Sequence, residues 1–176
     1  IGLGAMGAGM AANQAKAGHK VLAYDLSSAA LERARAQGCT PAASAAEAVK
    51  AADVVITMLP AGQHVRAVYH DEIMPNARPG ALLIDCSTID VDSARAVAKE
   101  AQAHNLAFAD APVSGGTAAA DSGALTFMVG CDEASFAQFE AALAPMAKAV
   151  IHAGEAGAGQ AAKICNNMIL GISMIG

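Results

Sequence analysis

The sequence predicts an α/β protein with a doubly wound, mainly parallel sheet, followed by the start of a long interdomain helix. Apolar runs rich in β-formers alternate with alanine-rich helical segments along most of the 176 residues. This alternation is typical of parallel strands joined by right-handed helical crossovers. Several runs, such as residues 53–59 and 81–85, are almost entirely apolar, which is the pattern of strands buried on both faces of a sheet.

The individual elements follow from these runs and from the residues that flank them. Strands are predicted at residues 20–25, 53–59, 81–85, 106–110, 125–129 and 149–152. Helices are predicted at residues 6–17, 28–37, 45–51, 90–104 and 133–143, and Asp90 is a suitable N-cap for the fourth. We expect one domain over residues 1–153, with only Ile1 left of its first strand. Residues 154–176 are expected to form a glycine-rich linker and the beginning of the interdomain helix.

Composition excludes several classes of protein. A hydrophobic share of 55% with 15% charged residues indicates a compact folded chain rather than a disordered one. The formal net charge of −5 argues against nucleic-acid binding, which favours a basic surface. No apolar run reaches the length needed to span a bilayer. We therefore expect neither a nucleic-acid partner nor a membrane partner.

The cysteines indicate a reducing compartment. Cys39, Cys86, Cys131 and Cys165 are scattered without CxxC or metal-ligand spacing, so we expect reduced thiols and no metal site. The bacterial cytoplasm is the expected location. Because the sequence begins at Ile1 without a methionine, a lost targeting peptide makes the mitochondrial matrix the alternative.

The first residues of the chain match the GxGxxG pattern of a Rossmann-type dinucleotide site. The motif consists of Gly2, Leu3, Gly4, Ala5, Met6 and Gly7. Gly2 permits the tight turn, Gly4 lets a pyrophosphate approach the backbone, and Gly7 allows close packing of the following helix. The next strand ends at Asp25, which can bind ribose hydroxyls and repel a 2′-phosphate. The motif therefore predicts NAD in preference to NADP; the alternative is a glycine-rich turn without a ligand.

Two further strand ends carry candidate binding residues. Leu59 and Pro60 follow one strand and Thr88 follows the next, at the edge where open parallel sheets bind ligands. These residues are candidates for the wall of the cofactor site, and ordinary turn and capping chemistry is the alternative.

Ser114, Gly115 and Gly116 form another candidate site. A hydroxyl beside exposed backbone N–H groups suits a substrate carboxylate. A serine nucleophile is the rival interpretation, but none of the five histidines lies in a recognisable elbow motif.

A lysine and two amides share one face of the last predicted helix. Lys163 and Asn167 are four residues apart, with Asn166 beside them, so their side chains can converge on one small ligand. The ammonium group of a partly desolvated lysine shifts its pKa readily, which suits proton transfer. The alternative is a lysine whose charged end reaches solvent from a packed helix.

Together these motifs resemble the β-hydroxyacid dehydrogenase family. The matching segments lie in one order over essentially the whole chain, at residues 2–7, 56–60, 84–90, 110–116, 125–130 and 159–168. The resemblance implies that Lys163 is the catalytic lysine and Asn167 a substrate-orienting amide. It also implies that Ser114, Gly115 and Gly116 bind the substrate carboxylate. The residues that match cofactor positions are Gly2, Gly4, Gly7, Asp25, Leu59, Pro60 and Thr88.

The resemblance further implies a reaction and a larger protein. Residues 88–90, 126–128 and 163–167 are more similar to hydroxyisobutyrate enzymes than to tartronate semialdehyde enzymes. The implied reaction is NAD-dependent oxidation of 3-hydroxyisobutyrate to methylmalonate semialdehyde, a step of valine catabolism, without a metal. The family also has an all-helical C-terminal domain that completes the active site and a homo-oligomer, so we expect this chain alone to be inactive.

Three alternatives stay open at this point. The first is a related dehydrogenase or reductase, such as tartronate semialdehyde reductase or an NADPH-type enzyme for another short acid. The second is a non-catalytic dinucleotide-binding module. The third, the 6-phosphogluconate branch, is disfavoured because the chain has no phosphate-binding signature beyond the glycine loop.

Overall fold

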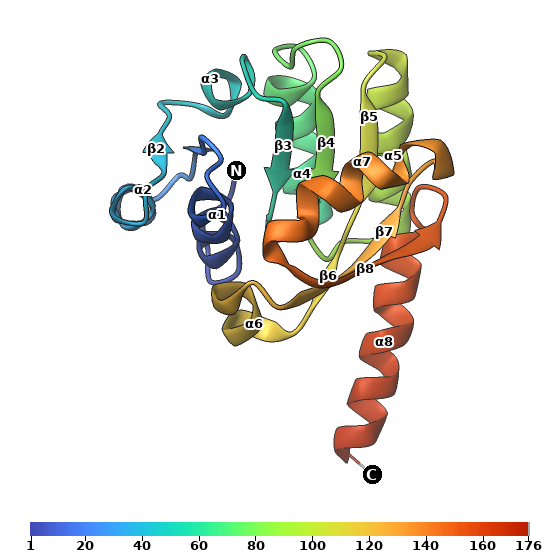
Figure 1. Cartoon of the computed structure of the whole chain (residues 1–176). Helices are drawn as coiled ribbons and strands as arrows, with labels where there is room; N and C mark the ends of the chain where they lie inside the picture. The colour runs from blue at the N-terminus through green and yellow to red at the C-terminus, as the bar shows by residue number, and fades with distance from the viewer. Residues whose placement is uncertain (176) are drawn as a thin grey trace.

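The computed structural model describes residues 1–175 as a layered α/β body from which one long helix projects (Figure 1). The strands are β1 (Leu22–Ala23), β2 (Thr40–Pro41), β3 (Val54–Thr57), β4 (Leu82–Asp85), β5 (Ala107–Asp110), β6 (Val113–Ser114), β7 (Leu125–Gly130) and β8 (Ala147–Gly154). The α-helices are α1 (Gly7–Lys16), α2 (Ser28–Ala36), α3 (Ala45–Val49), α4 (Gly62–Val68), α5 (Val91–Ala103), α6 (Gly116–Ser122), α7 (Glu133–Leu143) and α8 (Ala158–Ile175). A π-helical turn, η1 (Tyr69–Ile73), follows α4, and a 3₁₀ turn, η2 (Ala144–Met146), follows α7.

The main sheet is mixed rather than wholly parallel. β3, β4 and β5 are parallel neighbours, β7 runs antiparallel to β5 and β6, and β8 pairs in parallel with β7. The pairs Asp110–Gly130 and Ser114–Thr126 belong to one antiparallel register, so β5 and β6 form a nearly continuous run along one side of β7. The predicted mainly parallel α/β fold is confirmed, with this reversal at β7 as an addition.

Ile1 joins two parts of the molecule. β1 and β2 form a separate two-stranded parallel sheet, whereas the sequence predicts one sheet that includes a longer strand at residues 20–25. The Ile1 amine donates to the Ile56 carbonyl at 2.8 Å, and the Met58 amide donates to the Ile1 carbonyl. The neighbouring Gly2 amide donates to the Tyr24 carbonyl just after β1. The beginning of the chain therefore lies between the β1 and β3 segments; the extent of the domain and of its first strand stays a prediction.

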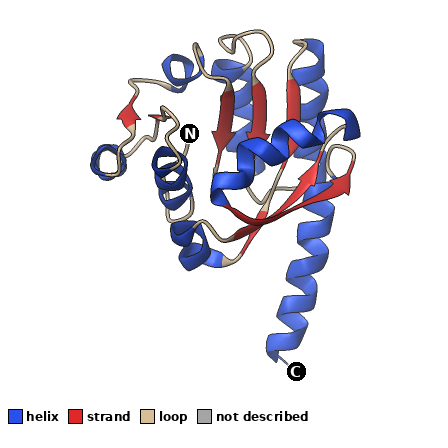
Figure 2. Cartoon of the chain, viewed as in Figure 1, coloured by secondary structure: helices blue, strands red, loops and turns tan. Residues whose placement is uncertain are grey.

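Helices cover both faces of the sheet (Figure 2), as a doubly wound fold requires. One face packs against α1, α6 and α7, and its core includes Phe127, Phe139 and Leu143. The opposite face packs against α3, α4, η1 and α5, and its core includes Tyr69 and Leu83. The core is aliphatic, as the low aromatic content of 3% indicates.

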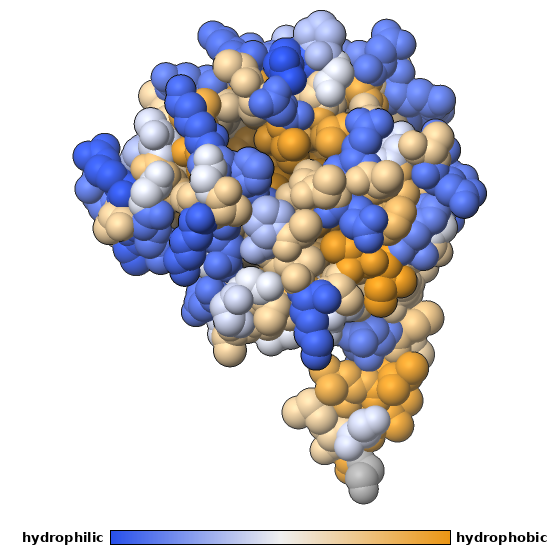
Figure 3. All heavy atoms as spheres, in the orientation of Figure 1, coloured by the Kyte–Doolittle hydropathy of each residue, from blue (hydrophilic) through white to orange (hydrophobic). Residues whose placement is uncertain are grey.

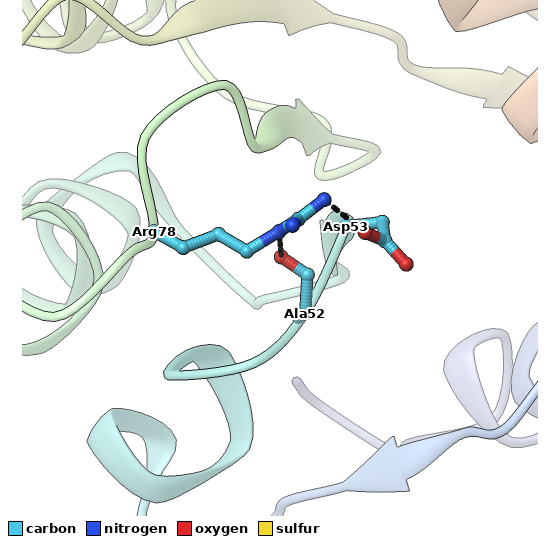
Figure 4. A network of polar contacts seen from close by, with 3 residues as sticks. All are labelled: Ala52, Asp53 and Arg78. Atoms are coloured by element: carbon cyan, nitrogen blue, oxygen red, sulfur yellow. Dashed lines mark hydrogen bonds and ion pairs between the residues drawn. The ribbon is translucent and has the colours of Figure 1, made fainter.

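The segment between β3 and β4 is more helical than the sequence predicts. α4 and η1 occupy residues that carry no predicted element, and they bury Val65, Tyr69 and Ile73 against the sheet. Arg78, in the loop that follows, donates to the Ala52 carbonyl at 3.2 Å and pairs with Asp53 (Figure 4). Because both charged side chains are largely exposed, this pair adds little to stability.

Within residues 1–175, no helix is long and apolar enough to cross a membrane. The same residues contain no group of three or more His, Cys, Asp or Glu side chains arranged to hold a metal ion.

Substitution of one buried and one exposed leucine tests the assignment of the core. Leu125 on β7 is fully buried, whereas Leu26 is 93% exposed. We expect Leu125→Ala to lower the free energy of unfolding by about 2–5 kcal/mol, because it removes buried methyl groups and leaves a cavity. The matched Leu26→Ala change should alter it by less than about 0.5 kcal/mol. Urea denaturation of both variants measures the difference, and equal effects would contradict the assigned core.

Candidate functional site

The glycine loop has the backbone geometry of a phosphate cradle. Gly2 has φ +86°, and a Cβ added there would lie 2.3 Å from the Met58 carbonyl oxygen. A Cβ at Gly7 would lie 2.0 Å from the Gly2 carbonyl oxygen, so the start of α1 packs directly on the loop. A Cβ at Gly4 would meet nothing within 4 Å. No side chain caps the N-terminus of α1, so its amides are free of side-chain acceptors and suit an anion.

Asp25 is fixed to this loop by both carboxylate oxygens. Oδ2 accepts the Leu3 amide at 2.6 Å, and Oδ1 accepts the Ser27 amide at 2.8 Å. A carboxylate oxygen has two lone-pair directions, so each oxygen keeps one for a ligand hydroxyl. The predicted ribose-binding acid is therefore also the residue that joins the glycine loop to the end of β1.

A groove of about 630 Å³ lies in front of the loop and Asp25. This volume falls within the range of small-molecule and cofactor sites. The predicted cofactor residues that line it are Gly2, Gly4, Ala5, Met6, Gly7, Asp25, Leu59 and Pro60. Leu3 is buried beneath the loop at 2% exposure, and Thr88 is exposed but does not line the groove.

The groove also contains residues to which the sequence assigns no role. Leu26 is almost fully exposed beside Asp25, and His64 reaches the groove from α4. The position of Leu26 directly after a strand-ending acid is the signal that could have identified it. His64 depends on α4, which no sequence pattern predicts.

Buried polar groups connect the ends of β3 and β4. Asp85 Oδ1 accepts the Thr57 hydroxyl at 2.8 Å, the Ser87 hydroxyl at 2.5 Å and the Ser87 amide at 3.2 Å. The Ser87 hydroxyl oxygen in turn accepts the Leu59 amide at 2.8 Å. Burial raises the pKa of Asp85 from 3.8 to about 6, although the hydrogen bonds from Ser87 and Thr57 oppose the shift.

Asp110 fixes the beginning of α8. Its carboxylate, at the end of β5, accepts the Gly157 amide at 2.6 Å and the Gln160 amide at 2.9 Å. The fully buried Gln160 side chain then bridges to the loop after β4, donating to the Ser87 carbonyl at 2.8 Å and accepting the Ile89 amide at 3.1 Å. Desolvation raises the pKa of Asp110, and these amides oppose the shift. Sequence reasoning assigns no role to Asp110 or Gln160.

Lys163 lies on α8 one turn after Gln160 and is partly buried. Desolvation lowers the pKa of its amine below the ordinary value of 10.5. Asn167 is exposed, and the Asn166 side-chain amide donates to its oxygen at 3.4 Å. The predicted face of lysine and amides therefore exists on one helix, outside the lining of the groove.

The predicted substrate loop lies on the same stretch of chain as Asp110. Ser114 ends β6, and the exposed Gly115 and Gly116 begin α6. Ser114 is four residues after Asp110 along a nearly extended run, so their Cα atoms are within roughly 14 Å of one another. The structure therefore attaches the predicted substrate loop and the lysine helix to one segment, residues 110–116.

Comparison with known proteins assigns the greater part of the chain to one family. The family described as the NAD binding domain of 6-phosphogluconate dehydrogenase matches residues 1–154. The Dictyostelium discoideum protein named "Probable 3-hydroxyisobutyrate dehydrogenase, mitochondrial" is 49% identical over 99% of this chain and 55% of its own length. An NAD-dependent L-serine dehydrogenase of Pseudomonas aeruginosa is 48% identical over 100% of this chain and 60% of its own length.

A solved structure agrees with these sequence relatives. Mycobacterium tuberculosis 3-hydroxyisobutyrate dehydrogenase with L-serine superposes with a TM-score of 0.96 at 50% identity. The superposition covers 99% of this chain and 60% of that protein. The chain thus spans between 55% and 60% of the length of these three proteins.

Two glycines of the loop allow cofactor binding and folding to be separated. We expect Gly4→Ala to leave stability unchanged, because its Cβ enters open space, and to weaken NAD binding at least about tenfold. Gly7→Ala should lower the free energy of unfolding by about 1–3 kcal/mol, because its Cβ meets backbone. Calorimetric titration with NAD and urea denaturation measure the two effects. Unaltered NAD affinity in the Gly4 variant would remove the loop from the cofactor site.

Proposed function

Because the chain belongs to the family of the NAD binding domain of 6-phosphogluconate dehydrogenase, we propose that the protein is an NAD-dependent dehydrogenase of short 3-hydroxy acids. The proposed reaction is oxidation of 3-hydroxyisobutyrate to methylmalonate semialdehyde, a step of valine catabolism. One observation carries the proposal: a helix bearing a partly desolvated lysine is hydrogen-bonded to Asp110 at the end of β5 and to Ser87 after β4, and Ser87 also accepts the amide of Leu59 in the groove wall.

The groove residues fit NAD. The open space at Gly4 and the uncapped start of α1 suit a pyrophosphate, and Asp25 retains acceptor capacity for ribose hydroxyls. Leu59 and Pro60 supply an apolar wall, and Thr88, exposed after β4, is assigned to the nicotinamide end. When bound, NAD supplies the acceptor for the hydride that the substrate carbon loses.

Lys163 is the proposed general base. Its amine takes the proton of the substrate hydroxyl during oxidation, and the resulting ammonium returns a proton to the carbonyl oxygen during reduction. Desolvation aids the first role because it lowers the pKa of the amine and so increases the neutral fraction at a given pH. The ammonium also stabilises negative charge on the reacting oxygen, which a metal ion would otherwise do.

The remaining substrate contacts come from two places. Ser114 and the amides of Gly115 and Gly116 are the proposed carboxylate site, because all three are accessible and the two glycines begin a helix. Asn167, four residues after Lys163 on α8, orients the substrate beside the lysine.

L-Serine is the second candidate substrate. It shares the carboxylate and the primary C3 alcohol of 3-hydroxyisobutyrate, and the two differ in the C2 substituent, which is an ammonium in one and a methyl group in the other. The 48% identity to a protein named an L-serine dehydrogenase favours including it. The proposed roles of Lys163 and the residue 114–116 loop are the same for both.

The apolar face of α8 is the proposed connection to the rest of the protein. Its exposed hydrophobic residues are Ile164, Met168, Ile169, Leu170, Ile172, Met174 and Ile175. Figure 3 shows a largely hydrophobic surface on the helix that stands away from the body. Such a surface indicates an interface, and we assign it to an all-helical C-terminal domain and a homo-oligomer. The described cysteines are all free thiols, consistent with the bacterial cytoplasm, or the mitochondrial matrix as the alternative.

Replacing Lys163 tests the chemistry. In a full-length protein carrying this sequence, Lys163→Ala should lower kcat at least about a hundredfold, because general-base assistance is lost, while the Kd for NAD stays within about twofold of the wild type. The exposed Lys99 provides the matched control, and Lys99→Ala should leave both values unchanged. Near-normal turnover in the Lys163 variant would remove the proposed base.

The pH profile of the wild-type enzyme adds an independent test of the base. Oxidation requires the neutral amine, so kcat should rise with pH, with a midpoint below the ordinary lysine value of 10.5. Reduction requires the ammonium and should fall with pH over the same range. Stopped-flow rates in the two directions measure both profiles. If the pH dependence of oxidation is unchanged in Lys163→Arg, the base is a residue other than Lys163.

A panel of substrates and cofactors tests specificity. With NAD, 3-hydroxyisobutyrate should give the highest kcat/KM, and NADP should be at least about tenfold worse because Asp25 repels a 2′-phosphate. Asp25→Ser should reduce that preference. Higher kcat/KM with L-serine would exchange the proposed substrate for the second candidate, and no absorbance change with any hydroxy acid would indicate a non-catalytic binding module.

A further inference from the structure

Asp85 is a buried carboxyl group to which neither the motifs nor the proposed mechanism assigns a role. It ends β4, opposite Thr57 on β3 and Asp110 on β5. Its side chain is fully buried, and Oδ2 has no hydrogen-bond partner among residues 1–175. Burying a carboxyl group with one unpartnered oxygen is energetically costly.

The hydrogen bonds around Asp85 all point toward it. Oδ1 accepts the Ser87 amide at 3.2 Å. It also accepts the Ser87 hydroxyl, 2.5 Å away, whose own oxygen accepts the Leu59 amide. Thr57 donates to the same oxygen at 2.8 Å, so the Tyr69 hydroxyl, 3.1 Å from the Thr57 oxygen, donates in turn.

This arrangement connects Asp85 to the cofactor wall and to α8. Leu59 lines the groove, and its amide donates to the Ser87 hydroxyl that Asp85 orients. The Ser87 carbonyl accepts the Gln160 side chain, three residues before Lys163 on α8. One carboxyl thus sets the position of the loop between the groove and the lysine helix.

We propose that Asp85 is a positioning residue: by orienting the Ser87 hydroxyl it fixes the Leu59 amide at the cofactor wall and the loop that carries Thr88. The effect of this role on NAD binding and turnover rests on the proposed function. The hydrogen-bond relay from Asp85 through Ser87 to Leu59 is a property of the chain itself.

The protonation of Asp85 can be used to probe its hydrogen bonds, because few other groups around it titrate near neutral pH. The titratable groups that face it are Asp110 on β5, Tyr69 from η1 and the Cys86 thiol beside it. Burial raises the pKa values of Tyr69 and Cys86 well above their ordinary values, so neither group titrates near neutral pH. Asp85, with a pKa of about 6, loses its proton there, and its hydrogen bonds strengthen as the charge appears.

Variants at Asp85 separate positioning from stability. Asp85→Leu removes the acceptor and leaves the Thr57 and Ser87 donors without it, so it should also lower the free energy of unfolding. NAD affinity is therefore measured under conditions in which the variant is folded. We expect its Kd for NAD to rise about tenfold in the full-length protein, because the Leu59 amide loses its oriented acceptor. Asp85→Asn retains the Oδ1 acceptor and should stay within about threefold of the wild type. Ser87→Ala should weaken NAD binding as Asp85→Leu does.

A control and a spectroscopic readout decide the outcome independently of activity. Gln14→Leu removes a buried hydrogen bond to the Ala142 carbonyl at the far end of α1 and should change stability but not NAD affinity. The spectroscopic readout is the amide NMR signal of Leu59 in ¹⁵N-leucine-labelled protein, which is assigned by its loss in Leu59→Met. In the wild type, the chemical shift of this amide should change with pH, with a midpoint near pH 6. The shift should be absent in Asp85→Asn and in Ser87→Ala.

Three results would overturn the proposal. They are a wild-type Leu59 signal that does not move with pH, a shift that persists in Ser87→Ala, and wild-type NAD affinity in Asp85→Leu. A protein that binds no dinucleotide at all would contradict the proposed function instead, and the Leu59 titration would still decide whether the relay exists.

Discussion

The hydrogen bonds of Asp110 to the first turn of α8 are the interaction on which the arrangement of the site depends. They place a carboxylate from the end of β5 at the N-terminal amides of a helix, where negative charge is favoured. Hydrogen bonds to a charged group typically contribute about 1.5–3 kcal/mol each, which offsets part of the cost of burying Asp110. Together with the Gln160 side chain, they fix the position of α8 and Lys163 relative to the strand ends.

The interior polarity of the molecule is concentrated at this same edge. Thr57, Asp85, Ser87, Asp110 and Gln160 are all fully buried, and each lies at or near the carboxyl end of a strand or at the start of α8. Elsewhere the core clusters consist of apolar side chains, mainly aliphatic. Buried polar groups are costly unless they are paired. The paired side chains at this edge therefore specify one arrangement of the strand ends and the start of α8, rather than adding general stability.

The sequence predicts the layers well and the connections between them less well. Continuous apolar runs identify β3, β4, β5, β7 and β8, and GxGxxG with Asp25 identifies the groove, because these signals are local. The reversal of β7 and the separate β1–β2 sheet depend on long-range pairing, which periodicity does not encode. Asp85, Ser87 and Gln160 gain their roles from partners up to 73 residues away, so no spacing rule could identify them. The roles of Lys163, Asn167 and the residue 114–116 loop stay predictions.

The structure divides the site into two parts with different physical requirements. The groove is built from residues 1–72 and already has its loop, its acid and its apolar wall. The lysine helix is fixed at its start by Asp110 and Gln160, yet beyond Lys163 most of its apolar side chains are exposed. Dinucleotide affinity should therefore depend mainly on the groove and on the Asp85 relay, whereas turnover also requires whatever covers α8. Changes in the groove should accordingly alter the Kd for NAD and changes on α8 should alter kcat, because the groove lies at the ends of β1 and β3 and α8 is bonded at the ends of β4 and β5.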